Sequence, residues 1–403
     1  MEVIRVEQHQ IKPTHYLYKY CNDLCFKSKN LYNYANYLIR QEFINNGKWL
    51  RYKDIYKIIK DHETYKALMA QTSQQILKLL DQNWKSFFKS IKEWKDNKEK
   101  YLGRPKLPKY KKKNGRNIVI FTNQNCKLKD GYIKFPKIMN KEKLKTKIKG
   151  KLQQIRIIPK GQIYVIEIIY KKEIEDKTTK NKGRIIGIDL GLNNFATIVN
   201  NIGLNPIVVK GKVIKSINQY YNKQLAYYKS ILKKQNNKDW SKRLERITMK
   251  RNNKIKTFMH KASRFIINYC IENNIDTIVL GNNKNWKQEV KLGKRNNQNF
   301  TSIPYETFIQ QLQYKAEEVG IKVIVVEESY TSKASFLDKD KMGQDAKFSG
   351  KRIKRGLYKS KDGILINADV NGGYNIIRKV FPKAFANGIE GVGLHPVKLQ
   401  IVA

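Results

Sequence analysis

The sequence is poor in cysteine. Its 403 residues include only Cys21, Cys25, Cys126 and Cys270, and none of them forms a CxxC pair. This scarcity excludes a disulfide-rich secreted scaffold and leaves no ligand spacing typical of zinc. Cys21 and Cys25 are four residues apart in a helical pattern, so a shared helix face explains them better than half of a zinc site. We therefore predict a reducing cytosolic environment and no bound zinc.

Long hydrophobic runs are also missing. No stretch of 18 apolar residues occurs, and the N-terminus, M-E-V-I-R-V-E, has no continuous apolar segment. A membrane-spanning helix needs about 20 mostly apolar residues, and a signal peptide needs an apolar centre. We expect a soluble protein without a membrane partner, located in the cytoplasm and associated with the nucleoid.

Negative charge is scarce as well. There are 34 Asp and Glu residues against 82 Lys and Arg, which gives a formal net charge of +48. Such a chain repels itself unless a polyanion neutralises it, and nucleic acid phosphates do so with release of counterions. Hydrophobic residues make up 40% of the chain, which is enough to bury a core. The charge leaves open a nucleic-acid enzyme or a ribosomal or chromatin-type binding protein.

The first 182 residues combine helical and strand patterns. Residues 1–12 alternate as a strand does, and residues 14–100 have helical periodicity, with one helix starting at Thr72 and a capping box to Gln75. Residues 176–182 are polar and predict a linker. Further strands, which together with the first suggest a small β-barrel, are expected at 118–122, 132–135, 152–158 and 162–170.

A basic segment follows the helical block. Residues 101–116 read Y-L-G-R-P-K-L-P-K-Y-K-K-K-N-G-R, and two prolines end the preceding helix. Such a run is usually a solvated connection. Its aromatic and proline content favours contact with nucleic acid instead, through Arg104, Lys106, Lys109 and Lys111.

From Gly183 onward the pattern is that of an α/β domain. Three closely spaced strands come first, then two long helical segments, then a strand, a helix, a strand, a polar insert and a last helix. This is the element order of the ribonuclease H fold. The expected strands and short helices are 184–190, 195–199, 206–210, 277–280, 305–319, 321–327 and 369–380.

Two acidic motifs lie about 180 residues apart. In I-I-G-I-D-L-G-L, Asp189 lies in a strand buried on both faces, where a carboxylate is unfavourable unless it is paired, and Mg²⁺ suits its oxygens. An Asp that bonds a turn, or the D-x-G of sugar-kinase and actin-like ATPases, would also explain it. In N-A-D-V-N-G-G-Y-N-I, Asp369 starts a helix with small residues, although it would also suit a plain N-cap.

These two motifs resemble the first and third RuvC motifs of TnpB nucleases and of their relatives, the type V CRISPR effectors. S-Y-T-S-K at 329–333 and G-R-P-K-L-P-K-Y-K-K-K are also similar to TnpB. The resemblance is strong over 183–382 and weaker over 1–182. It implies a wedge-like β-barrel (1–13 and 101–182), a helical recognition domain (14–100), a RuvC nuclease domain with the RNase H-like α/β fold (183–332 and 363–382), a nucleic-acid-binding insert (333–362) and a C-terminal tail (383–403).

The middle catalytic Glu of the family is missing at its usual place. The end of the fourth strand, T-I-V-L-G-N-N, has Gly281 there, whereas Glu327 and Glu328 end the next strand. Neighbouring strands are about 4.8 Å apart, so a Glu from the fifth strand can reach the same site. We favour Glu328, because it stands where relatives often have the Pro of P-x-Y-T-S and Glu327 should face the other way. Both would otherwise only flank a turn.

The insert also departs from the family, many members of which bind zinc there through two CxxC pairs. Residues 334–362 have no cysteine, so zinc is not expected. K-R-I-K-R-G-L-Y offers charge and an aromatic ring, Tyr358, suited to a phosphate backbone and a stacked base. Arg352 and Arg355 would contact phosphate near the scissile bond or belong to a general basic patch. The full set of candidate contacts here is Lys351, Arg352, Lys354 and Arg355.

The resemblance implies an RNA-guided DNA endonuclease of a transposable element. Asp189, Glu328 and Asp369 would hold two Mg²⁺ ions about 3.5–4 Å apart for phosphodiester hydrolysis, with Mn²⁺ as a substitute. The implied partners are a guide RNA from the transposon end and double-stranded target DNA with a short flanking motif; the oligomeric state stays open. A nuclease-inactive RNA-guided repressor, favoured by Gly281 and opposed by Glu328, and a transposase or its accessory protein are the alternatives.

Overall fold

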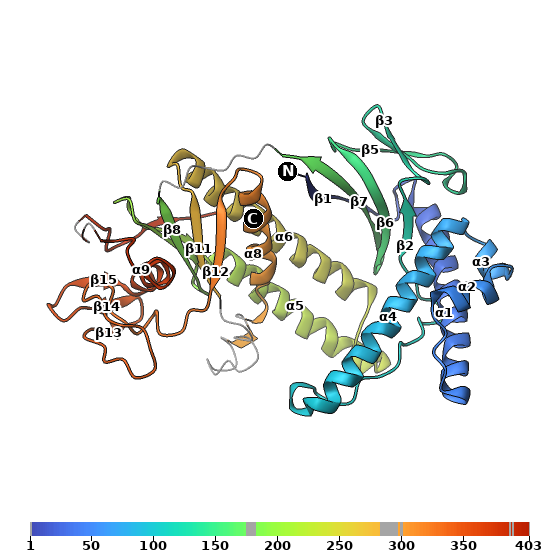
Figure 1. Cartoon of the computed structure of the whole chain (residues 1–403), viewed down its shortest axis with the longest axis horizontal. Coiled ribbons are helices and arrows are strands. Elements are labelled where there is room, and N and C mark those ends of the chain that lie inside the picture. The colour runs from blue at the N-terminus through green and yellow to red at the C-terminus, as the bar shows by residue number, and fades with distance from the viewer. Residues whose placement is uncertain are drawn as a thin grey trace. The chain divides into compact units, whose positions relative to one another are not determined.

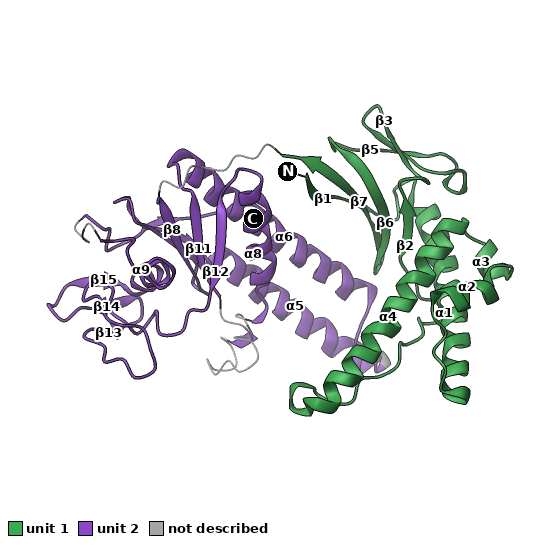
Figure 2. Cartoon of the chain, in the orientation of Figure 1, with its two compact units in different colours: residues 1–175 green, residues 176–403 purple. Residues whose placement is uncertain are grey.

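The computed structural model (Figure 1) describes residues 2–174, 183–282, 297–298, 301–386, 388 and 391–402. The chain divides into two compact units, Met1–Glu175 and Asp176–Ala403 (Figure 2). The predicted linker at 176–182 lies outside the described residues. Among the helices that the structure describes, none is both long enough and apolar enough to cross a membrane.

The first unit contains two antiparallel sheets. The strand pattern predicted from the sequence is confirmed, but the expected barrel is wrong: in the described residues the main sheet has the open order β1-β7-β6-β2. Its two edge strands do not pair with each other, and a three-stranded sheet stands separately. The main strands are β1 (Glu2–Ile11), β2 (Val119–Thr122), β6 (Lys151–Lys160) and β7 (Ile163–Glu173), and the small ones are β3 (Lys127–Lys129), β4 (Tyr132–Lys134) and β5 (Lys143–Lys145).

Helices fill the interval between β1 and β2. They are α1 (Tyr18–Asn46), α2 (Tyr52–Ile59), α3 (Glu63–Lys66) and α4 (Ala70–Asp96), followed by a short 3₁₀ turn at Lys98–Lys100; a second 3₁₀ turn, Lys137–Met139, lies between β4 and β5. The apolar stripe of α4 packs into the core, with Trp84 fully buried. The predicted start at Thr72 is wrong, because Met69 precedes the first turn and Thr72 is buried inside it. The Ser73 hydroxyl donates to the Tyr65 carbonyl, so contact with α3 rather than a capping box holds this end.

The second unit is built on a six-stranded mixed sheet in the order β12-β11-β8-β9-β10-β16. The central strand β8 pairs antiparallel with β9 and parallel with β11, and β11 pairs parallel with β12. The predicted strands are confirmed to within a few residues. The bounds of these strands are β8 (Ile185–Leu190), β9 (Asn194–Asn200), β10 (Ile207–Lys210), β11 (Thr277–Gly281) and β12 (Lys322–Val326), and the sixth strand, which was not predicted, is β16 (Val397–Leu399).

Helices cover both faces of this sheet (Figure 1). Because side chains alternate along a strand, Ile186 and Ile188 pack on the face of α6 and α8, whereas Ile185 packs on the face of α9. The same alternation places Asp189 on the α9 face. The long helices among the described residues of this unit are α5 (Lys212–Asn236), α6 (Lys242–Glu272), α8 (Tyr305–Glu317) and α9 (Ala368–Val380).

Two segments near the C-terminus differ from expectation. The polar insert contributes β13 (Lys351–Lys354) and β14 (Leu357–Lys359) to an antiparallel sheet whose third strand, β15 (Leu365–Asn367), follows the insert. The predicted C-terminal tail, 383–403, is not a tail throughout. Its strand β16 pairs parallel with β10, and Ile401 packs in the core. Edge-strand pairing of this kind depends on a partner distant in sequence, which local periodicity does not reveal.

Candidate active site

Asp189 lies near the carboxyl end of the central strand, facing α9. The helix approaches closely because glycines face the strand: a Cβ on Gly372 would lie 3.2 Å from Asp189 Oδ2, and one on Gly187 would lie 2.6 Å from the Gly373 carbonyl. The residue as a whole is partly exposed, whereas its carboxylate is largely removed from water. The G-G pair of the second motif therefore serves to bring α9 onto the Asp189 carboxylate.

The charges around Asp189 identify its neighbours. Burial raises the pKa of Asp189 well above its usual value, and the carboxylates of Glu328 and Asp369 raise this pKa further. Arg352 acts in the opposite direction. Like charges raise a carboxyl pKa only at short range. The structure thus brings the three predicted acidic side chains into one region.

Glu328 reaches this region from the end of β12. In the parallel register Gly281 pairs with Val326, two residues before Glu328. A Cβ on Gly281 would lie 2.7 Å from Glu328 Cδ and closer still to its Cγ and Oε1. The Glu328 side chain therefore occupies the space that a side chain at position 281 would need.

The surroundings of Glu328 hold it in place and perturb its charge. The backbone N–H and hydroxyl of Thr331 donate to the Glu328 carbonyl at 3.1 and 2.8 Å. Burial raises the pKa of Glu328 to about 7, and the Lys379 ammonium opposes this shift. Glu327 is exposed. Of the two acids, Glu328 is the one that lies against Gly281.

Asp369 is the second residue of α9 and does not cap it. The cap is Asn367, whose Oδ1 accepts from the backbone N–H groups of Asp369 and Val370 at 3.0 and 3.2 Å. This leaves the Asp369 carboxylate for other contacts, and the plain N-cap interpretation is wrong. Its Oδ2 accepts from Asn194 Nδ2 at 2.6 Å, and its Oδ1 lies 3.9 Å from an Arg352 nitrogen.

Two residues at this site were missed by sequence reasoning. Asn194 starts β9, shortly after the first motif. In L-G-L-N-N it is typical of a turn, so nothing in the sequence placed it in the site. The hydroxyl of Tyr305, at the start of α8, donates a hydrogen bond to the Gly191 carbonyl at 2.8 Å and so stabilises the turn after Asp189. Burial, Asp189 and Glu328 all raise the pKa of Tyr305. Its proximity to the acids could not be found from local pattern.

The donor set suits a hard divalent cation, because carboxylate oxygens are the ligands that Mg²⁺ prefers. Within the described ranges, however, no three His, Cys, Asp or Glu side chains lie closely enough together to enclose an ion. Like-charged carboxylates repel one another, and Asp369 is engaged by Asn194 and Arg352. The three acids share a region of the fold without forming a closed cage.

The predicted basic contacts of the insert lie on or beside β13. Lys351, Arg352, Lys354 and Arg355 are all exposed, and Arg352 is the one that reaches Asp369. The expected stacking role of Tyr358 is wrong. Only 1% of this residue is exposed, and its hydroxyl donates to the Lys333 carbonyl at 2.7 Å. Alternation along β14 turns Tyr358 into the core beside α9.

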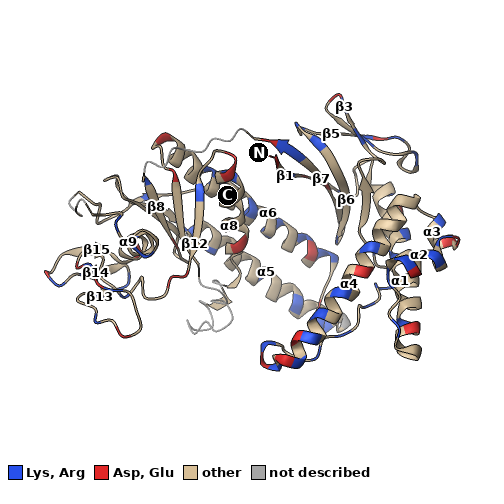
Figure 3. Ribbon diagram, viewed as in Figure 1, with Lys and Arg blue, Asp and Glu red and all other residues tan. Residues whose placement is uncertain are grey.

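The basic contacts predicted in the other unit lie along the segment after α4. Arg104, Lys106 and Lys109 are exposed, whereas Lys111 is partly buried, with its ammonium 4.9 Å from the centre of the Tyr32 ring. Basic residues also recur along α4 (Figure 3). The second unit, taken by itself, is an α/β protein with an acidic centre at the carboxyl end of its central strand.

Comparisons with known proteins find two family models that match parts of this chain. A family model described as probable transposase, OrfB_IS605, matches residues 167–287, which include Asp189. A second model, the TNB domain of Cas12f1-like proteins, matches residues 305–376, which include Glu328 and Asp369. The two matches thus contain all three acidic residues of the candidate site.

Individual relatives agree with the family models. The TnpB-like protein ORF457 of Acidianus two-tailed virus is 25% identical over 397 residues, covering 87% of this chain and 81% of the relative. The CRISPR-associated endodeoxyribonuclease Cas12f1 of Sulfoacidibacillus thermotolerans is 33% identical over 135 residues, covering 33% of this chain and 29% of the relative.

A solved structure shows the same fold. The Cas12f1 protein in the cryo-EM structure of a Cas12f1–sgRNA–target DNA complex matches with a TM-score of 0.50 at 16% identity, covering 88% of this chain and 81% of that one. The chain is therefore similar to TnpB-like proteins and to Cas12f1, over parts of its length in the family models and over most of its length in the TnpB-like relative.

Proposed function

We propose that this chain is an RNA-guided DNA endonuclease of a transposable element, with an RNase H-like RuvC nuclease domain formed by residues 183–332 and 363–382. The observation that carries the proposal is that three acidic side chains, from β8, from the end of β12 and from the start of α9, lie in one region of the fold, where Glu328 and Asp369 both raise the pKa of Asp189. Carboxylates that lie close enough together for their like charges to raise a pKa are typical of functional sites. The likeness to a TnpB-like protein and to an endodeoxyribonuclease supports it.

In this function Asp189, Glu328 and Asp369 would hold Mg²⁺, or Mn²⁺ in its place, in a two-metal site. When bound, such ions supply a Lewis acid that activates water and stabilises the charge of the leaving oxygen. The chain's own residues have separate tasks. The carboxylates offset the cation charge, Asn194 orients Asp369 through its 2.6 Å hydrogen bond, and Arg352 stands at the rim to contact a phosphate.

The guide and target follow from the relatives and the charge. Cas12f1 has been solved with sgRNA and target DNA, and a net charge of +48 demands a large polyanion. We propose that residues 1–13, 14–100 and 101–182 hold a guide RNA from the transposon end and read a short motif beside the target. Base pairing would then supply sequence specificity. The insert at 333–362 would contact the strand near the acids, and the protein would act in the cytoplasm on the nucleoid.

The test is cleavage of target DNA by the chain with guide RNA and Mg²⁺. Asp189→Ala, Asp369→Ala and Glu328→Gln should each abolish cleavage and leave RNA binding unchanged. Glu327→Gln is the matched control, because it removes one acidic charge from the adjacent exposed residue, and it should cleave nearly as wild type does. Full cleavage by Asp189→Ala would contradict the site. Target binding without cleavage by wild type would favour the repressor, and activity that survives RNase treatment would favour a transposase.

A further inference from the structure

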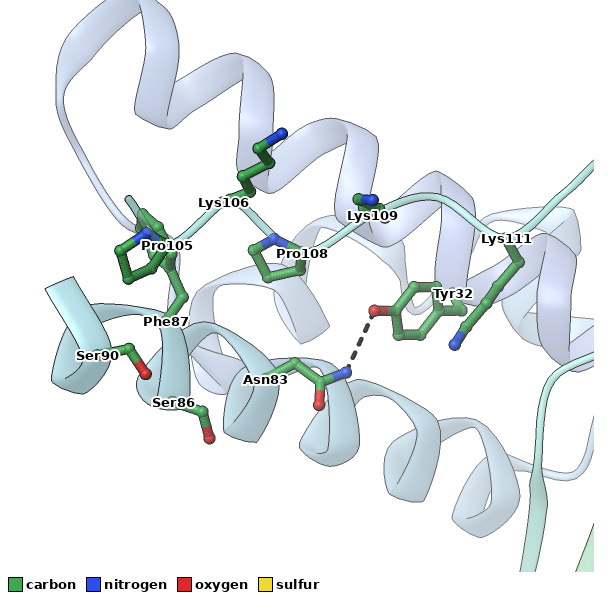
Figure 4. A pocket seen from close by; sticks show the side chains of 10 residues that line it. All are labelled: Tyr32, Asn83, Ser86, Phe87, Ser90, Pro105, Lys106, Pro108, Lys109 and Lys111. Carbon is green, nitrogen blue, oxygen red and sulfur yellow. Dashed lines mark hydrogen bonds between the residues drawn. The ribbon is translucent and has the colours of Figure 1, made fainter. Parts of the chain in front are cut away.

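A cavity of about 390 Å³ in the first unit lies between α1, α4 and the basic segment after α4 (Figure 4). Its volume lies within the range of about 300–1,000 Å³ that is usual for small-ligand pockets. None of the three carboxylates of the acidic centre belongs to it. It is lined by Tyr32, Asn83, Ser86, Phe87, Ser90, Pro105, Lys106, Pro108, Lys109 and Lys111.

One wall of this cavity is an extended segment that α1 holds in place. The side chains of Lys29, Asn33, Asn36 and Arg40 lie along one face of α1, three or four residues apart. They donate to the carbonyls of Lys113, Lys111 and Pro108 at 2.9 to 3.1 Å, with Asn36 and Arg40 both donating to Pro108. Asn36 is itself fixed, because its Oδ1 accepts from Trp84 Nε1 at 3.0 Å. The segment is therefore ordered before any ligand arrives, although it has no regular secondary structure.

The opposite wall is one face of α4, which combines polar and apolar groups. Asn83, Ser86 and Ser90 are spaced three and four residues apart, and Asn83 Nδ2 donates to the Tyr32 hydroxyl at 3.2 Å. Phe87, between them, is held from behind by Trp84, with ring centres 6.0 Å apart. Figure 4 shows Phe87 extending from the helix toward Pro105 and Asn83 pointing to Tyr32, whereas the Ser86 and Ser90 hydroxyls lie along the helix and point away from the prolines. The walls thus offer flat apolar surfaces next to hydroxyl and amide groups.

The charged side chains that line the cavity are all basic. Lys106, Lys109 and Lys111 supply three ammonium groups, and none of the described residues that line the cavity carries a carboxylate. Lys106 and Lys109 are exposed, so their charges stand at the rim, whereas Lys111 lies over the Tyr32 ring. Flat apolar surfaces suit a base, hydroxyl and amide groups suit its edges, and rim lysines suit a phosphate.

We propose that this cavity binds one unpaired nucleotide of a single-stranded nucleic acid. The base packs between Phe87 and the prolines, and the adjoining phosphate is bound by Lys106 and Lys109. The proposal rests on the proposed function for its partner, since it takes nucleic acid as the ligand, but it does not depend on cleavage. Either the RNA or a single DNA strand would supply such a nucleotide.

The experiment measures the affinity of the full chain, in EDTA, for fluorescent single-stranded oligonucleotides over a range of salt concentrations. One arm uses oligouridine RNA, one oligothymidine DNA and one blunt duplex DNA. The variant Lys106→Gln/Lys109→Gln should lower single-strand affinity about tenfold and reduce the salt slope by about 0.7 for each phosphate that is no longer bound. The matched control is Lys89→Gln/Lys92→Gln, which removes the same charge from exposed α4 positions outside the cavity.

A second variant separates stacking from charge. Phe87→Leu keeps an apolar side chain against Trp84, so the unit should remain folded, which a thermal melt checks. Without the stacked base, single-strand affinity should fall about tenfold while the salt slope stays unchanged. Duplex affinity should not change, and the single-stranded arm with the larger loss of affinity identifies whether RNA or DNA supplies the nucleotide.

Three results would overturn the proposal: equal effects of the two lysine pairs, wild-type affinity in Phe87→Leu, or an equal loss of affinity for duplex DNA. Competition by a poly-glutamate peptide as strong as that by oligonucleotide would show a general anion patch and would overturn it too. Failure here is distinguishable from failure of the proposed function. Asp189→Ala should keep this binding, and a cavity without a nucleotide would leave the cleavage test unaffected.

Discussion

Gly281 should be essential for cleavage although it carries no functional group. A Cβ there would lie 2.7 Å from Glu328 Cδ, whereas ordinary contacts between carbon atoms are about 3.5–4.0 Å. In Gly281→Ala the Glu328 carboxylate must therefore move by about 1 Å. Misplacement of this size can lower a rate about 100-fold. Because the displaced group is the end of a flexible side chain, the loss of folding stability should stay near the lower end of about 1–3 kcal/mol for overpacking.

The assay is single-turnover cleavage of target DNA at saturating guide RNA, with RNA affinity measured in parallel. Gly343→Ala is the matched control, because it is a glycine of the same unit whose added Cβ would meet nothing within 4 Å. Gly281→Ala should cleave about 100-fold more slowly than this control while binding RNA equally well. Cleavage at the rate of Gly343→Ala would refute the reasoning, because the Glu328 carboxylate would then not need its observed place.

A swap tests the same geometry from the other side. Glu328→Gly should be inactive, and Gly281→Glu should also be inactive because two side chains compete for one space. The double variant Gly281→Glu/Glu328→Gly carries the acid on β11 without that conflict. We expect it to recover activity about tenfold above either single variant. No recovery, with all three proteins folded, would show that a carboxylate from β11 does not reach the acidic centre in this chain.

The other predictions concern stability and positioning. Burial raises the pKa of Glu328 from 4.5 to about 7, so the stability that this group contributes is greatest below pH 4.5 and falls as pH rises through 7. In EDTA at pH 8, Glu328→Gln should therefore be more stable than wild type by about 3 kcal/mol, and at pH 4 the two proteins should be equally stable. Addition of Mg²⁺ should raise the melting temperature of wild type and leave that of Glu328→Gln unchanged. Asn194→Ala removes a 2.6 Å hydrogen bond to Asp369 and should slow cleavage about tenfold at unchanged RNA affinity; an unchanged rate would exclude a positioning role. Trp84→Ala, at a fully buried ring, should destabilise the first unit by about 3–5 kcal/mol in denaturant unfolding, and a destabilisation below about 1 kcal/mol would contradict its place in the core.

Local periodicity predicted most of the elements. The short apolar runs at 184–190 and 277–280 and the helical segments between and after them were sufficient for element order, because each pattern lies within one segment. The predicted start of α4 and the predicted barrel were wrong, because both features depend on contacts between separate segments. Contact between Ser73 and α3 decides where α4 begins, and closure of a sheet depends on edges that meet or do not meet.

Some residues of the candidate site could be predicted from the sequence, and others could not. Asp189 and Asp369 stand in motifs that the sequence displays, and their neighbourhood follows from a strand end and a helix start. Sequence alone did not show that Asn194 binds Asp369 or that Tyr358 turns into the core, since each depends on contacts between distant segments.

What the sequence determined by itself is the order and type of the elements and the positions of the acids along them, because these depend on side chains a few residues apart. Only the tertiary structure decided which acid fills the space over Gly281, which residues surround it, and that the basic segment forms a cavity with α4. The physical reason is that these features arise from excluded volume and hydrogen bonds between segments dozens of residues apart, and such contacts leave no periodic trace in the chain.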